Sequence, residues 1–226
     1  MMREITPEKL HLDIMPRATK KAFLKCMELP WLKDSSWYLA GGTALALQVG
    51  HRVSVDLDFF TEEKDFSVEA LEKLLMSSGD WTTTLIERGT LYGIFEGAKM
   101  SFIAYPFFRP SGDQLRCGSV VLVSPEDIAA MKIVAVSQRG KKRDFIDLYW
   151  LAQNRISLED AIRLSVERYP DQHHNLPHFL KSLVYFADAE EDPMPNVFFA
   201  VDWKTVKVFF EKEIPVLAEK MLHLEK

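Results

Sequence analysis

The sequence predicts an α/β fold, in which a mixed twisted sheet flanked by helices is followed by a C-terminal helical lobe. Runs rich in β-branched and aromatic residues, separated by glycine turns, recur between residues 38 and 123. From Ser124 onward the apolar residues follow a helical period instead. We therefore expect an α/β core over residues 1–123 and a helical lobe over residues 124–226.

Composition is that of an ordinary soluble protein. The chain has 226 residues, of which 47% are hydrophobic and 27% charged. A net charge of −5 provides no global field for nucleic acid, so any RNA contact must use a local basic patch. Cys26 and Cys117 have neither metal-ligand nor disulfide spacing. No signal peptide or membrane-length apolar run is seen, and we expect a cytoplasmic location without a membrane partner.

The first elements alternate between helix and strand. We expect an amphipathic helix that Pro16 kinks or divides, a short strand, a short helix and a longer strand. Gly41-Gly42 ends the short strand, and the Thr43 hydroxyl is placed to cap the short helix. These four elements are expected over residues 7–29, 38–40, 44–49 and 53–60.

A helix capped by Ser67 is expected next, followed by an antiparallel meander of three strands and one further short strand. Glycines at the boundaries between runs predict the turns of the meander. These elements are expected over residues 67–76, 81–87, 90–96, 99–107 and 120–123.

The helical lobe begins with a strong start signal, in which Ser124 precedes Pro125 and two acidic residues. The last helix is amphipathic and is expected to break or bend at Pro215. The helices are expected over residues 125–138, 142–153, 158–169, 177–187 and 202–222.

The strand predicted over 53–60 carries a pair of carboxylates. Because side chains alternate along a strand, Ser54, Asp56 and Asp58 are expected on one face. Two carboxylates so close repel each other unless a divalent cation lies between them, and Mg²⁺ (or Mn²⁺) binds through such carboxylates plus substrate phosphates. Gly41-Gly42 before a helix allows close approach of phosphate to backbone N–H groups. The combination points to phosphoryl or nucleotidyl transfer.

A second group of charged residues lies in the first two helices of the lobe. Lys132 is at or beside an apolar helix face, where a lysine is uncommon unless its ammonium reaches a partner. Such a point charge on a long stem suits phosphate binding, although a lysine that only extends to solvent at the helix edge has the same pattern. Asp144 and Asp147 are neighbours on one helix face and could instead pair with surface cations. Arg139, Lys141, Lys142 and Arg143 form a basic run that is either a solvated charge run or a contact for incoming phosphates.

These residues carry a family resemblance. Gly41-Gly42-Thr43 followed by Ser54-Val55-Asp56-Leu57-Asp58 resembles the first motif of the DNA polymerase β-like nucleotidyltransferase superfamily. With Lys132 and the Arg143-Asp144-x-x-Asp147 segment, the chain resembles the AbiEii/AbiGii toxin family over about residues 37–150. The resemblance implies a nucleotidyltransferase core that moves a nucleoside monophosphate from an NTP to tRNA or another RNA. It also implies a toxin–antitoxin or phage-defence setting, with an antitoxin protein as partner.

The same resemblance assigns roles to individual positions. Lys132 contacts the triphosphate or the active centre, and Asp147 is favoured over Asp144 as the catalytic carboxylate, since Asp144 could instead orient Lys132. The implied catalytic residues are Asp56, Asp58, Lys132 and Asp147, with Asp56 and Asp58 as metal ligands. The implied nucleotide- and phosphate-binding residues are Gly41, Gly42, Thr43, Ser54, Arg143 and Asp144.

One position departs from the superfamily pattern. Many relatives carry a third carboxylate on a later core strand, whereas the segment Lys99–Pro106 has no acidic residue and places Ser101 at the corresponding position. Two-metal chemistry needs ligands for both ions. Either Asp147 substitutes, or one metal suffices, or the protein is an inactive relative that binds nucleotide or a protein partner.

Overall fold

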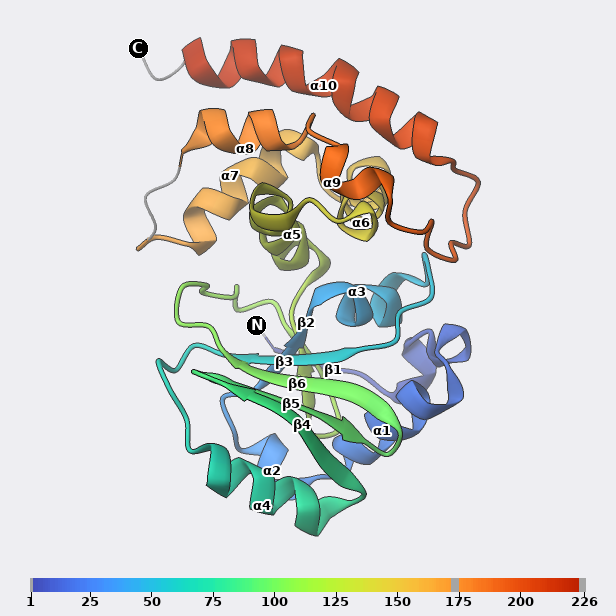
Figure 1. The fold of residues 1–226 in the computed structure, drawn as a ribbon, viewed down its shortest axis with the longest axis vertical. Coiled ribbons are helices and arrows are strands. Elements are labelled where there is room, and N and C mark those ends of the chain that lie inside the picture. Colours follow the sequence, from blue (N-terminus) through green and yellow to red (C-terminus); the bar gives the residue numbers. More distant parts are fainter. Residues whose placement is uncertain (1, 172–174, 224–226) are drawn as a thin grey trace. The chain divides into compact units, whose positions relative to one another are not determined.

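A computed structural model describes residues 2–171 and 175–223 of the chain. The residues form two compact units, Met1–Ser124 and Pro125–Lys226. The first unit contains an eight-stranded mixed sheet flanked by helices, which confirms the predicted fold class (Figure 1). Over the described ranges, no helix combines the length and hydrophobicity needed to cross a bilayer.

The sheet has the strand order β1-β7-β8-β2-β3-β6-β5-β4. Its central pair, β2 and β3, is antiparallel, while β2 pairs parallel with β8 and β3 pairs parallel with β6. The predicted antiparallel meander is confirmed as β4, β5 and β6. The strands are β1 (Arg3–Glu4), β2 (Tyr38–Ala40), β3 (Leu57–Thr61), β4 (Trp81–Glu87), β5 (Thr90–Phe95), β6 (Ala98–Ala104), β7 (Leu115–Cys117) and β8 (Val120–Leu122).

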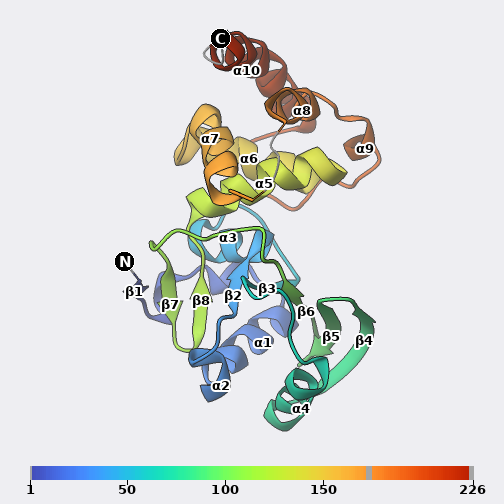
Figure 2. The same cartoon turned by 90° about the vertical axis from the view of Figure 1, so that its left-hand side faces the viewer.

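Four α-helices belong to this unit (Figure 2). Pro16 does divide the helix predicted at the N-terminus, because only short 3-10 turns at Pro7–Lys9 and Leu12–Ile14 precede it. The predicted cap at Ser67 is confirmed, since its hydroxyl accepts the Ala70 N–H at 3.2 Å. The helices are α1 (Arg17–Met27), α2 (Pro30–Lys33), α3 (Gly41–Val49) and α4 (Val68–Ser78).

One face of the sheet is the core of this unit. Phe102 of β6 lies in its middle and is fully covered. Four aromatic rings, from α2, β3, β4 and the segment before β2, surround it, and each such pair adds about 0.5–1.5 kcal/mol beyond its buried area. These ring neighbours of Phe102 are Trp31, Trp37, Phe59 and Trp81.

The strand predicted over 53–60 begins later than expected, at Leu57. Its partners explain the difference, because β2 ends at Ala40, opposite Asp58, and the neighbouring β6 register starts at Leu57. Ahead of that point, the Val55 carbonyl accepts a hydrogen bond from the Thr19 hydroxyl at 2.9 Å rather than from a strand. Ser54 and Asp56 therefore precede the strand, and the predicted start of the strand at Val53 is wrong.

The regular elements of the second unit are helices over its described residues, joined by loops of which the longest precedes α10. Aromatic rings from three segments pack together in its core. The Phe145 ring of α6 contacts Phe186, just before α9, and Trp203 and Phe210 of α10. The expected break at Pro215 is absent, because α10 continues through it as one helix. The helices are α5 (Pro125–Arg139), α6 (Lys142–Asn154), α7 (Leu158–Arg168), α8 (Leu176–Ser182), α9 (Ala187–Glu190) and α10 (Trp203–His223).

Candidate functional site

The turn from β2 into α3 depends on Gly41. Its φ of +70° is a left-handed conformation that costs an L-residue with a side chain roughly 1–2 kcal/mol. A Cβ at this position would lie 3.6 Å from the Asp58 Oδ2 atom. The turn therefore brings bare backbone against the Asp58 carboxylate at the start of α3, where helix N–H groups favour an anion.

Gly42 is needed for a different reason. A Cβ there would collide with the Arg52 guanidinium and would come within 3.4 Å of the Ser54 hydroxyl. Arg52 is buried, and its Nη1 donates to the Val53 carbonyl at 2.9 Å. The glycine thus makes room for a buried cation directly over the first turn of α3.

Thr43 does not cap α3, which corrects the sequence-based prediction. The helix already begins at Gly41, with Ala40 as its N-cap residue. The buried Thr43 hydroxyl instead bonds the Ser54 hydroxyl at 2.8 Å and the Asp56 carbonyl. Thr43 therefore ties α3 to the segment that carries Ser54 and Asp56, and the half-buried Asp56 directly precedes β3.

Asp58 is held from the neighbouring strand. The Ser101 hydroxyl of β6 donates to Asp58 Oδ1 at 2.6 Å, and the two residues are register partners. Ser101 is thus the residue at the position where the superfamily resemblance implies a third carboxylate. Across the described residues, no cluster of three or more His, Cys, Asp or Glu side chains is arranged to hold a metal ion.

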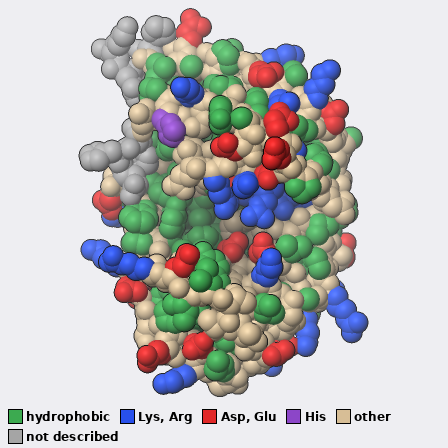
Figure 3. Space-filling model, in the orientation of Figure 1, with side chains coloured by type: hydrophobic (Ala, Val, Ile, Leu, Met, Phe, Trp, Pro, Cys, Tyr) green, Lys and Arg blue, Asp and Glu red, His purple; other side chains and the backbone are tan. Residues whose placement is uncertain are grey.

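The net charge of the chain does not identify an anion-binding surface. In Figure 3 several Lys and Arg side chains gather near the middle of the face, with acidic side chains around them, and the net charge of the chain is −5. Any anion recognition must therefore come from individual groups such as Arg52 and the first turn of α3.

In the helical unit, Lys132 is the centre of a buried ion cluster. Its Nζ lies 2.5 Å from Asp144 Oδ1 and 2.7 Å from Asp147 Oδ2. Lys132 is 5% exposed and both aspartates are fully buried. The lysine is therefore no solvent-reaching side chain at a helix edge, and the aspartates do not simply pair with surface cations.

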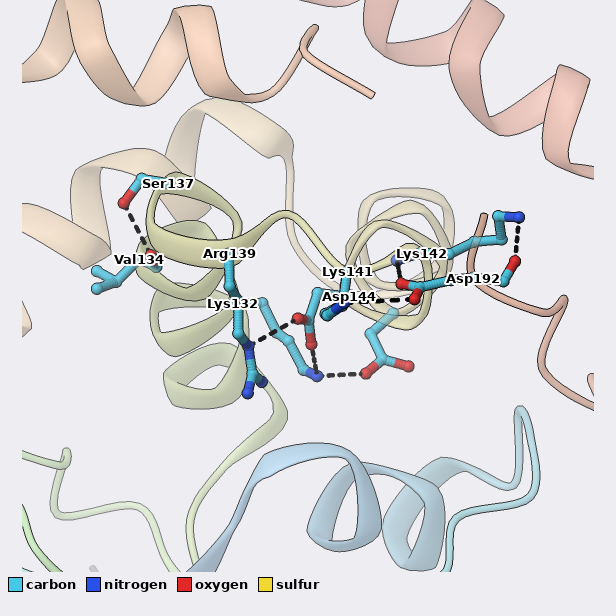
Figure 4. Close-up of polar contacts among 9 residues, drawn as sticks. Lys132, Val134, Ser137, Arg139, Lys141, Lys142, Asp144 and Asp192 are labelled. Atoms are coloured by element: carbon cyan, nitrogen blue, oxygen red, sulfur yellow. Dashed lines mark hydrogen bonds and ion pairs between the residues drawn. The ribbon is translucent and has the colours of Figure 1, made fainter. Parts of the chain in front are cut away.

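Arg139 adds a second positive charge to this cluster. Figure 4 shows Lys132 and Arg139 of α5 directed at Asp144 of α6. Arg139 Nε lies 3.4 Å from Asp144 Oδ2, and that buried oxygen accepts no hydrogen bond. The contact is therefore an ion pair, and Asp144 is balanced by two cations.

The chain reversal between α5 and α6 makes the cluster possible. Gly140 has a φ of +50°, so the chain turns sharply between the two helices. The start of α6 is then fixed from outside the helix, because Asp192 Oδ2 accepts the Lys142 N–H at 3.0 Å. The Lys142 ammonium also donates to the Glu190 carbonyl at 3.1 Å and to the Asp192 carbonyl. The segment before α10 thereby braces the helix that carries Asp144 and Asp147.

The structure brings the predicted residues together in two groups, one within each unit. Gly41, Gly42, Thr43, Ser54 and Asp58 gather around the start of α3, next to Asp56. Lys132, Asp144 and Asp147 form the second group, whereas Arg143 is exposed on α6 and lies outside the buried cluster.

Sequence reasoning left two contributors outside the predicted site. Arg52 is not among the predicted site residues, and its burial over Gly42 makes it part of the first group. Asp192 lies in a segment to which no chemistry was assigned, and only the fold shows its contact with α6. Neither the contact of Arg52 with Gly42, about ten residues earlier, nor the Asp192 contact, which spans 50 residues, follows from a local sequence pattern.

Comparisons with known proteins find matches over most of this chain. A family model described as "Nucleotidyl transferase AbiEii toxin, Type IV TA system" matches residues 31–80 and 109–220. An uncharacterised protein of Aquifex aeolicus is 31% identical over 203 residues, which is 88% of this chain and 96% of that protein. The unmatched residues between the two family segments include β4, β5 and β6.

Two solved structures share the fold. MenT4, a nucleotidyltransferase toxin of Mycobacterium tuberculosis, has a TM-score of 0.56 and 14% identity, covering 90% of this chain and 86% of its own. JHP933 of Helicobacter pylori has a TM-score of 0.50 and 16% identity, covering 92% of this chain and 93% of its own.

Proposed function

The chain belongs to the AbiEii family of nucleotidyltransferase toxins, and from that premise we propose that it transfers a nucleoside monophosphate from an NTP to an RNA acceptor. In this reaction an acceptor hydroxyl attacks the α-phosphorus, the bond from that phosphorus to the bridging oxygen breaks, and pyrophosphate leaves. The proposed setting is a toxin–antitoxin or phage-defence pair in which a partner protein restrains the enzyme. The observation that carries the proposal is Asp58 held against the Gly41 turn.

The first group suits the triphosphate. The amides at the start of α3 and the Arg52 guanidinium supply donors and positive charge, and Thr43 and Ser54 fix the segment that leads to Asp56. Asp56 and Asp58 fit a hard cation, because they are two carboxylates only two residues apart, and carboxylate oxygens are the ligands that Mg²⁺ prefers. These two carboxylates would hold Mg²⁺ or Mn²⁺, which when bound neutralises charge on the phosphate oxygens.

The second group supplies a positioned ammonium. A lysine has three N–H donors, and two of those on Lys132 are directed to Asp144 and Asp147. We assign the third donor to a phosphate oxygen, where positive charge stabilises the charge that develops in the transition state. Asp147 is the proposed acceptor of the hydroxyl proton, with Lys132 orienting its carboxylate.

A second candidate function follows from Ser101. A serine at this register position gives Asp58 a hydrogen bond but adds no ligand for a second metal ion. The alternative is thus an inactive nucleotidyltransferase relative that binds nucleotide or a protein partner without turnover.

Labelled nucleotides separate the two candidates. Full-length protein is incubated with Mg²⁺, total RNA and NTPs labelled at either the α- or the γ-phosphate. The proposed transferase moves only the α-label to RNA, and Asp56→Ala abolishes the transfer. Glu62→Ala, which removes an exposed acid just after β3, should leave transfer unchanged. NTP binding without label transfer in the wild-type protein would support the inactive alternative.

A further inference from the structure

The sheet has a second face beside Asp58 that the core does not use. Side chains alternate along each strand, so the residues that flank the buried Phe59 and Phe102 point away from the aromatic core. Asp58 of β3, Ser101 of β6, Tyr92 of β5 and Leu85 of β4 are successive register partners across this face. The row thus leads directly from the candidate metal-binding carboxylate to an aromatic ring.

The far end of this row is apolar and accessible. Leu85 is 51% exposed, and Ile94, which lies on the same face two residues from Tyr92, is 39% exposed. Tyr92 is itself half-buried between them. We call Leu85, Tyr92 and Ile94 the Tyr92 platform.

The chemistry of Tyr92 suits a flat, polar-edged ligand. Burial raises the pKa of the Tyr92 phenol, and the negative charges of Glu87 and Asp58 add to this effect. The phenol therefore keeps its proton at neutral pH and can donate a hydrogen bond next to an aromatic face. Adjacent strands lie about 4.8 Å apart, so the backbones of Asp58 and Tyr92 are about 10 Å apart, within the span of one nucleotide.

We propose that the Tyr92 platform binds a nucleobase, whose phosphate is held at the Asp58 end of the same row. The proposal rests on the proposed function, since it presumes that a nucleotide occupies the Gly41 turn. The platform lies in the meander that the family model leaves unmatched, between residues 80 and 109, so the family description assigns it no role. The base belongs either to the NTP or to the terminal nucleotide of the acceptor, and stacking is chemically the same for both.

Two binding arms distinguish these sources. Each of the four NTPs and a short single-stranded RNA are titrated separately into the full-length wild type and into Tyr92→Ala, Tyr92→Phe and Leu85→Ala. If the base stacks on Tyr92, the Tyr92→Ala variant should bind one of the two ligands, NTP or RNA, about tenfold or more weakly than the wild type. Tyr92→Phe retains the ring and should stay within about threefold of wild type. Leu85→Ala removes an apolar neighbour of the ring and should weaken binding of the same ligand as Tyr92→Ala, by a smaller factor. A loss of affinity confined to NTPs would show that the platform binds the base of the NTP. A loss confined to RNA would show that it binds the base of the acceptor.

Inorganic tripolyphosphate is the control ligand, because it has no base. Its affinity should be equal in the wild type and Tyr92→Ala. Unchanged binding of every NTP and of RNA to a folded Tyr92→Ala protein would overturn the proposal, as would a loss with Tyr92→Phe as large as with Tyr92→Ala. If the wild-type protein binds neither NTP nor tripolyphosphate, the proposed function itself fails. If it binds tripolyphosphate as tightly as NTPs and does not bind RNA, only the platform fails. Tyr185→Ala, at an exposed tyrosine of the helical unit, should change none of these affinities.

Discussion

Replacing Lys132 with methionine should be far more damaging to the helical unit than the loss of an ordinary ion pair. The substitution keeps the length of the side chain but leaves Asp144 and Asp147, both fully buried, without the ammonium that lies 2.5 and 2.7 Å from them. Breaking a buried ion pair by removing one partner typically costs about 3–5 kcal/mol, because the remaining charge is uncompensated. Arg139 lies 3.4 Å from Asp144 only, so we expect a free-energy loss within this range rather than complete unfolding.

Amide hydrogen exchange measures this loss where it occurs. Peptides from α5 and α6 of full-length Lys132→Met should show opening free energies about 3–5 kcal/mol lower than in the wild type. Arg163→Met is the matched control, since it also removes one cation but breaks an i,i+4 pair in which Arg163 is 52% exposed. The opening free energies of this control should fall by less than about 1 kcal/mol. Equal protection of α5 and α6 in the two variants would refute the buried cluster.

Three further substitutions test other parts of the site. Gly41→Ala should destabilise the first unit by roughly 1–2 kcal/mol and weaken tripolyphosphate binding, whereas Gly89→Ala, at a φ of +69°, should cost the same stability with no loss of binding. Mg²⁺ should increase the Tm of Ser101→Asp by more than it increases the Tm of the wild type, because the new carboxylate is a further cation ligand beside Asp58. An equal increase in the two proteins would argue against a cation at Asp58. Asp192→Ala removes the acceptor of the Lys142 N–H and should lower the opening free energy of α6 by about 0.5–2 kcal/mol, measured by hydrogen exchange; unaltered exchange would exclude Asp192 as a brace.

The sequence predicts elements well where one local signal decides them. The meander follows from β-rich runs between glycine turns, and the start of α4 follows from the Ser67 cap. Both outcomes depend on residues within a few positions of each other. The paired strands β1 and β7 escaped prediction because they are only two and three residues long, and their pairing connects distant segments.

Around the site, the predictions from sequence fail where the interacting residues are far apart in the chain. The strand that carries Asp58 was placed too early because Val53 and Val55 have high β-propensity, yet β2 provides no partner for them before Asp58. Thr43 was read as a helix cap because threonine is among the residues preferred at the N-cap position. Its actual partners, Ser54 and the Asp56 carbonyl, are 11 and 13 residues away. Spacing showed the two carboxylates that bond Lys132 only as neighbours on a helix, and the family resemblance alone suggested that Asp144 orients Lys132. Their contact with α5 depends on the turn at Gly140.

The proposed function requires the first group, with Asp56, and the second group, around Lys132, to serve one chemical step. A double-mutant cycle tests it, with α-label transfer to RNA measured for full-length Asp56→Asn, Asp147→Asn and the combined variant. Residues that act as a unit are strongly non-additive. We therefore expect each single variant to lose nearly all transfer, and the double variant to be no worse than either. Transfer that persists in Asp147→Asn, or losses that simply multiply in the double variant, would contradict the claim.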